Sequence, residues 1–201
     1  AVWAKVTNTY MGYTITPIVL TSPTILTANY YDRYEFIGLN NVPNTTDFNY
    51  ETNSTYGTRY TGGYKGFQTG SITALLDGSG GYLYTSVYYD NRERVIQTKQ
   101  TNHLTGGIEK DFIAYNFVDQ PTKKLHIHSA TGKTTQSELF VYSYDQAGRL
   151  TETTHQLNGG TTVSLAKNTY DELGRLKTNT KGNNTNLAST YTYNIRSWVK
   201  S

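Results

Sequence analysis

Two histidines are the side chains whose spacing comes closest to a metal site. His126 and His128 alternate in a segment with strand character, so both side chains point to one face, as two ligands of a metal ion would. A third ligand is needed. His103, His155, Asp119 and Glu138 are the available candidates, but sequence spacing does not bring any of them to the pair. We therefore expect solvated or stacked histidines, no metal and no cofactor.

Carboxylates could supply a glycosidase pair. The chain has 15 acidic residues, and in a sheet some of them become neighbours by chance. The sequence contains no Gly-x-Ser-x-Gly elbow, phosphate loop or dinucleotide fingerprint. We expect no enzyme, and a carbohydrate-active enzyme is only a third hypothesis. The net charge of +3 comes from scattered Lys and Arg, so nucleic acid is not expected as a partner.

Aromatic rings are the remaining candidates for binding. The chain has 19 Tyr, 6 Phe and 2 Trp among its 201 residues, and hydrophobic residues make up only 36%. Exposed rings can stack on sugars while Asn, Thr and Arg bind hydroxyl groups. Tyrosines that recur at a repeat period are more simply explained as framework. This composition favours a sheet partly wetted on both faces over a thick aliphatic core.

A seven-residue sequence motif, which we call the phrase, occurs twice and predicts the elements that must position these side chains. It reads Tyr144-Asp145-Gln146-Ala147-Gly148-Arg149-Leu150 and again Tyr170-Asp171-Glu172-Leu173-Gly174-Arg175-Leu176. Degenerate copies begin at Tyr89, Tyr115 and Tyr193, so the starts are 26, 29, 26 and 23 residues apart. Self-similarity at such a period is typical of repeat architectures.

Each copy of the phrase predicts a hairpin. Before the first turn the strand period places Phe140, Tyr142 and Tyr144 on one face and Leu139, Val141 and Ser143 on the other. Asp145 and Asp171 can accept main-chain N–H bonds at the start of a type I turn, and Gly148 and Gly174 can take the left-handed backbone at its end. Arg149 and Arg175 can fold back on their Asp while covering a tyrosine ring. The phrase is thus a turn and packing motif.

A second set of turns lies between the motif turns. Gly and Asn supply the positive backbone angles of tight hairpins at 77–81, 105–107, 130–133, 158–160 and 181–184. Turn signals every 10 to 15 residues predict an all-β fold, an antiparallel meander of repeat hairpins forming a curved sheet. We divide the chain into an N-terminal β segment, 1–81, and a repeat array, 82–201, within one continuous sheet. A polar stretch at 38–62 is expected to be a long surface loop, either a recognition site or a floppy insertion.

The phrase Tyr-Asp-x-x-Gly-Arg-Leu resembles the signature of the Rhs/YD-repeat family, intact at 144–150 and 170–176. The copy at 89 has Glu93 in the glycine position, and the copies at 115 and 193 replace Gly-Arg-Leu by Asp119-Gln120-Pro121 and Ser197-Trp198-Val199. The resemblance implies a β-sheet ribbon that spirals into a hollow shell, as in bacterial polymorphic toxins, insecticidal toxin complexes and animal teneurins. In the toxins that shell encloses a C-terminal effector.

The leading hypothesis is therefore a non-enzymatic segment of an exported Rhs/YD-repeat protein, secreted or at a bacterial cell surface, that builds part of a shell or scaffold. The alternative is a cell-surface module that binds glycans or mediates adhesion. We expect the sequence to be a piece of a longer polypeptide whose remainder, with any enclosed effector, is its main partner. Open strand edges also predict a homo-oligomer, or a monomer whose ends are capped by residues 1–37.

Overall fold

The computed structural model describes residues 11–13, 23–39, 45–62 and 66–200. They contain eleven strands in one sheet whose order follows the sequence without a crossover. The strands are β1 (Thr27–Tyr31), β2 (Gln68–Ala74), β3 (Tyr82–Tyr89), β4 (Val95–Thr101), β5 (Ile108–Tyr115), β6 (Pro121–Ser129), β7 (Gln136–Tyr144), β8 (Leu150–Leu157), β9 (Val163–Tyr170), β10 (Leu176–Lys181) and β11 (Ala188–Thr190). Helix is confined to single turns: η1 (Glu35–Gly38), α1 (Thr45–Phe48), η2 (Ser54–Tyr56) and η3 (Thr185–Leu187). The predicted all-β antiparallel meander is confirmed.

Both predicted sets of turns lie at the strand ends. Motif turns connect β3 to β4, β5 to β6, β7 to β8 and β9 to β10, and the Gly- and Asn-rich turns connect most of the other neighbours. The register slips by one residue next to three motif tyrosines, Tyr89, Tyr144 and Tyr170. A type I turn followed by a left-handed residue produces this bulge. The motif therefore fixes the strand register as well as the reversal.

The chain forms two compact units. The first contains the residues up to Phe112 together with Ile127–Thr135, and the second contains Ile113–His126 together with Gln136–Ser201. Strands β5 and β6 contribute residues to both units. No described helix is long and apolar enough to cross a membrane.

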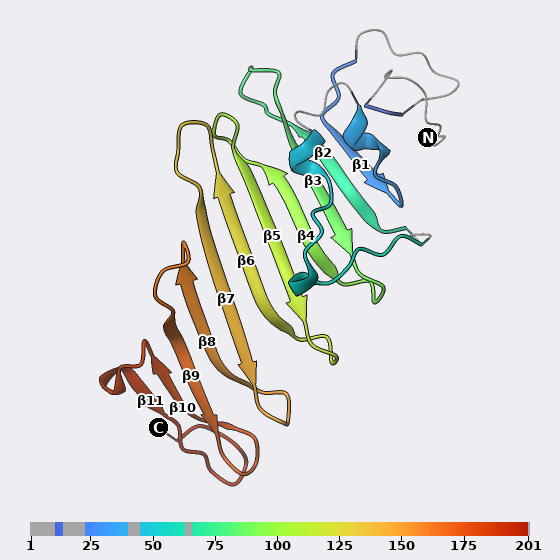
Figure 1. The fold of residues 1–201 in the computed structure, drawn as a ribbon. Coiled ribbons are helices and arrows are strands. Elements are labelled where there is room, and N and C mark those ends of the chain that lie inside the picture. The colour runs from blue at the N-terminus through green and yellow to red at the C-terminus, as the bar shows by residue number, and fades with distance from the viewer. Residues whose placement is uncertain (1–10, 14–22, 40–44, 63–65, 201) are drawn as a thin grey trace. The chain divides into compact units, whose positions relative to one another are not determined.

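The first unit buries a core on one face of β2 to β5. Its fully buried side chains include Ile72, Tyr88 and Ile96, each at most 1% exposed. A segment of residues 45–60, which we call the strap, runs over β3 and β4 on that face and reaches β5 at Tyr56 (Figure 1). The strap contributes Phe48, which is 0% exposed, and Tyr56, which is 6% exposed.

The strap differs from the long surface loop expected at 38–62. Phe48 packs edge-on against Tyr84, with ring centroids 6.2 Å apart, and Tyr56 lies 5.7 Å from the ring of Phe112. Its Asn- and Thr-rich composition nevertheless reads as a loop, because two buried rings in sixteen residues leave no strand or helix period. Residues 40–44 and 63–65 of the expected loop lie outside the described residues.

The second unit is thin. In β7 seven of nine residues are half-buried, and in β8 seven of eight. Ser164 and Ala114 are its buried residues among those described, at 7% and 8% exposed. Here the aromatic and polar side chains leave both faces partly wet, as the composition predicts, and specific side-chain contacts must hold the strands in place.

Candidate functional site between the motif turns

Asp145 organises its turn through three hydrogen bonds. Its Oδ1 atom accepts from the main-chain N–H groups of Ala147, at 3.0 Å, and Arg149, at 2.9 Å, while Oδ2 accepts from the Arg149 Nε atom at 2.7 Å. The main-chain bond from Arg149, together with its guanidinium, holds the pKa of the Asp145 carboxyl below its usual value. Gly148 has φ of 76°, in the left-handed region predicted for it.

The second intact copy has the same geometry. Asp171 accepts from the main-chain N–H groups of Leu173 and Arg175, at 3.0 and 2.8 Å, and from the Arg175 Nε atom at 2.7 Å. Gly174 has φ of 81°. The predicted turn is confirmed in both copies, including the return of each arginine to its aspartate.

The degenerate copies keep the turn even without glycine. Asp90, Asn116 and Asn194 each accept two main-chain N–H bonds, from the residues two and four positions later. Residues at the glycine position have positive φ throughout: Glu93 at 68°, Asp119 at 65° and Ser197 at 61°. In each copy the side-chain bonds at the second motif position, together with a main-chain bond from the fifth residue to the second, accompany a strained backbone at the fifth position.

Successive motifs are tied together by their tyrosines. The hydroxyl of Tyr170 donates to the main-chain carbonyl of Leu150 at 2.7 Å, and that of Tyr193 donates to Leu176 at 2.7 Å. Tyr144 makes the equivalent bond to Pro121 at 2.8 Å. In each case the acceptor is the seventh residue of the preceding motif, so Leu150 and Leu176 contribute their carbonyls.

The arginine of one motif also covers the tyrosine of the next. The Arg149 guanidinium lies 4.6 Å from the centre of the Tyr170 ring, and Arg175 lies 4.6 Å from that of Tyr193. A related pair occurs in the first unit, where the ring of Phe67 stacks on Tyr89 at 5.1 Å. Tyr89 also donates its hydroxyl to the Gln68 carbonyl at 2.8 Å. Sequence reasoning missed this earlier copy because it is split along the chain. Asp32 follows Tyr31, whereas Gly66 and Phe67, whose main-chain N–H groups donate to Asp32 Oδ1 at 2.7 and 3.2 Å, lie 34 and 35 residues later.

One junction departs from this rule. The motif at 115 has Asn116 and Gln120 where the intact copies have Asp and Arg, and these two side chains bind each other at 2.9 Å. Gln120 then donates to the Gly148 carbonyl at 2.6 Å. An amide replaces the guanidinium, and the described residues include no cation or ring stacked on Tyr144. An ion pair and its cation–π contact are thus replaced by a neutral polar pair.

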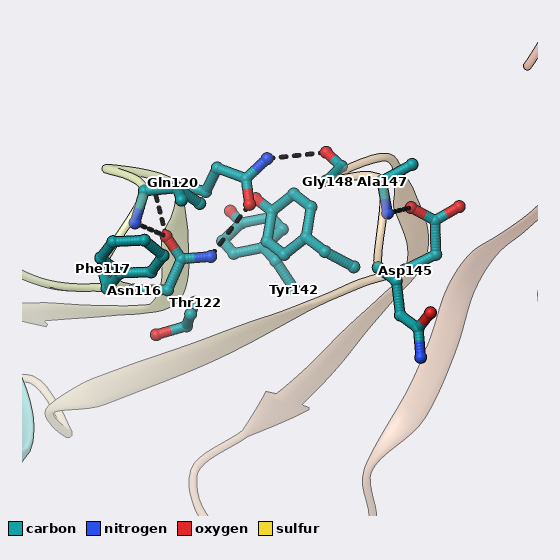
Figure 2. A pocket seen from close by; sticks show the side chains of 11 residues that line it. Asn116, Phe117, Gln120, Thr122, Tyr142, Asp145, Ala147 and Gly148 are labelled. Carbon is teal, nitrogen blue, oxygen red and sulfur yellow. Dashed lines mark hydrogen bonds between the residues drawn. The ribbon is translucent and has the colours of Figure 1, made fainter.

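A shallow open groove of about 640 Å³ lies at this junction (Figure 2). One wall is the turn at 116–122 and the other the strand end and turn at 142–148. Phe117 and Val118 stand at its border, 82% and 51% exposed, and the Tyr142 and Tyr144 rings line it. The sequence contains one signal for this groove, because Gln120 occupies the arginine position of its motif. The residue that Gln120 contacts across the junction, Gly148, is 28 residues away, so the sequence alone does not reveal the contact.

The residues that line the groove could contact a ligand, but they do not provide an acid and a base for catalysis. Its carboxylate, Asp145, is committed to the turn and its pKa is lowered, so it is a poor proton donor or acceptor near neutral pH. The other polar groups are amides and hydroxyls, which suit an uncharged polar ligand with an apolar face.

The predicted histidine pair does not form a metal centre. His128 Nδ1 lies 2.5 Å from Glu109 Oε1, which also accepts from Asn102 at 2.7 Å. His155 packs against Phe140, with ring centroids 4.8 Å apart. No group of three or more His, Asp or Glu side chains in the described part of the chain is arranged to hold a metal ion.

Comparison with known proteins adds no relative to this picture. No family model matches the chain, and a search of curated proteins found no match.

Proposed function

We propose that this chain is a non-enzymatic structural segment of an exported Rhs/YD-repeat protein. It forms part of a β-sheet shell or scaffold that encloses or presents a C-terminal effector. The observation that carries the proposal is the coupling between motifs, in which Tyr170 binds the carbonyl of Leu150 and lies under Arg149.

The physical argument concerns how a thin sheet stays ordered. Half-buried strands gain little from hydrophobic burial, so side-chain contacts between hairpins must supply order. The motif provides a turn cap, a tyrosine hydrogen bond and a guanidinium stack, each formed by residues of fixed spacing. Such a unit can be added repeatedly along a sheet, as a wall requires, and it uses its charged side chains for structure.

The reading frame that encodes the chain tests this proposal. Further copies of Tyr-Asp-x-x-Gly-Arg-Leu, followed by an unrelated domain, are expected in that frame. Protease treatment of intact source cells should also remove an epitope placed in the 158–162 turn, because an exported wall is accessible. A frame without further copies, or an epitope protected until the cells are lysed, would contradict the proposal.

Glycan binding is the second candidate, and the groove at the Gln120 junction favours it. Its neutral amides, the Thr122 hydroxyl and the exposed Phe117 ring suit a neutral sugar better than an ionic ligand.

A glycan-array screen should compare the wild-type chain with Phe117→Ala. The control is Leu173→Ala, which removes an apolar side chain that is 75% exposed on an intact motif turn. Binding that Phe117→Ala abolishes and Leu173→Ala retains is expected. Equal binding by both variants would exclude the groove.

A further inference from the structure

Side chains of the sheet bind the main chain of the strap. The carbonyl oxygen of Phe48 accepts two hydrogen bonds from β3, from Ser86 Oγ at 3.0 Å and from the Tyr88 hydroxyl at 2.5 Å. Both donor side chains are at most 1% exposed. Contacts of this kind do not depend on which side chain the bound segment carries.

Strand β4 continues the same mode of recognition. Gln97 makes a two-way contact with Glu51, donating to its carbonyl at 2.5 Å and accepting from its N–H at 3.2 Å. The Lys99 Nζ atom donates to the carbonyl of Asn49. Gln97 and Lys99 are both 0% exposed. Four side chains of β3 and β4 are therefore aimed at the backbone of residues 48–51.

Two strap side chains add selectivity. Phe48 is an aromatic anchor that is 0% exposed and packs against Tyr84. Three residues later, a carboxylate oxygen of Glu51 lies 2.8 Å from both Lys99 Nζ and Lys110 Nζ. The face therefore matches a segment in which an aromatic residue ends a helical turn and an acidic residue follows three positions later.

This arrangement is unusual for a face that only needs to be covered. Apolar side chains would bury a strap without the cost of desolvating a lysine and a glutamine. Burial lowers the pKa of Lys99, although its bond to Glu51 opposes that shift. The polar donors instead form a surface that holds the backbone of a peptide segment.

We propose that this face of β3 and β4 is a peptide-binding surface occupied by the chain's own strap. Its partner is a segment of another protein in which an aromatic residue ends a helical turn and an acidic residue follows three positions later. The strap competes with that partner. For a tethered segment at an effective concentration of about 1 mM and an intrinsic Kd of about 10 µM, the strap weakens apparent binding by about 100-fold.

Fluorescence anisotropy with a labelled peptide of residues 45–60 tests the proposal. The receptors are the full wild-type chain and its Phe48→Ala/Glu51→Gln variant, whose strap has lost the anchor and the charge. The variant should bind the peptide about 100-fold more tightly than wild type. Adding Lys99→Met to the variant, or placing Lys at position 51 of the peptide, should abolish binding.

Circular dichroism of each chain establishes that the sheet is intact. If the double variant loses its β signal, Glu51→Gln alone replaces it, with a smaller gain of about 10-fold expected because the Phe48 anchor remains. A folded variant that binds no better than wild type would overturn the proposal. Light scattering provides a second check, since a dimer formed through exchanged straps would make a second copy the occupant and would also overturn it.

Discussion

The hydroxyl of Tyr170 donates a hydrogen bond to the main-chain carbonyl of Leu150, 2.7 Å away and twenty residues earlier in the chain. Tyr193 repeats this relationship with Leu176. The two intact motifs therefore each provide a carbonyl acceptor for the tyrosine that follows. This bond links hairpins that the turn alone would leave independent.

Tyr170→Phe should lower the free energy of unfolding by about 1 kcal/mol, because it removes the hydroxyl and leaves the Leu150 carbonyl without that donor. Tyr142→Phe is the matched control, since the Tyr142 hydroxyl has no hydrogen-bond partner among the described residues. The control should change stability by less than about 0.5 kcal/mol. Urea unfolding measures both variants, and equal effects would show that the bond contributes nothing.

The glycine position of the motif gives a pair of opposite predictions. Gly148 has φ of 76°, so Gly148→Val should destabilise the chain by on the order of 1 kcal/mol or more through backbone strain. Glu93 occupies the same position of its motif with φ of 68°, so Glu93→Gly should relieve strain and stabilise by a similar amount. Thermal unfolding checks the signs, and two changes of the same sign would contradict the argument.

The junction at Gln120 should accept the missing ion pair. Asn116→Asp together with Gln120→Arg recreates the pair found in the intact motifs and places a guanidinium on Tyr144. A double-mutant cycle should show a favourable coupling of about 1 kcal/mol, since an arginine without its aspartate is not anchored. The same double variant should fill the groove and abolish any sugar binding there. Strict additivity of the two substitutions would mean that no stack forms.

Local chemistry explains why the turns were predictable and other features were not. Asp145 and Gly148 act within five residues, so the phrase itself specifies the reversal and the bulge. The bond from Tyr170 to Leu150 joins positions of two different motifs, and no spacing rule identifies a main-chain carbonyl as the acceptor. The Gln120 groove is a local substitution whose consequence appears only across a junction.

The strap was the harder feature to predict. Composition marks residues 45–60 as a polar loop, but the groups that hold them are backbone carbonyls. Ser86 and Lys99 lie on strands where alternation alone would allow a polar side chain to face water. Their burial arises because the strap covers them, a tertiary event that overrides the local pattern.

Lowering the pH should weaken the contact between the strap and the sheet, because the Glu51 carboxylate becomes protonated. Burial alone would raise the pKa of this carboxyl, but hydrogen bonds from Lys110 and Lys99 outweigh burial and hold the pKa below its usual value of 4.5. Asp47, which lies 3.7 Å from Lys110, is the other charged strap residue at this cluster. A carboxyl with a lowered folded pKa contributes stability that is complete above its unfolded pKa and is lost as the pH falls through the folded value.

Glu51→Gln should therefore destabilise the chain at pH 7, and its difference in stability from wild type should shrink as the pH falls below 4.5. Glu172→Gln, at an exposed motif turn, is the control and should show no such trend. Urea unfolding at neutral and acidic pH measures both, and a Glu51→Gln difference that persists undiminished in acid would show that its charge does not hold the strap.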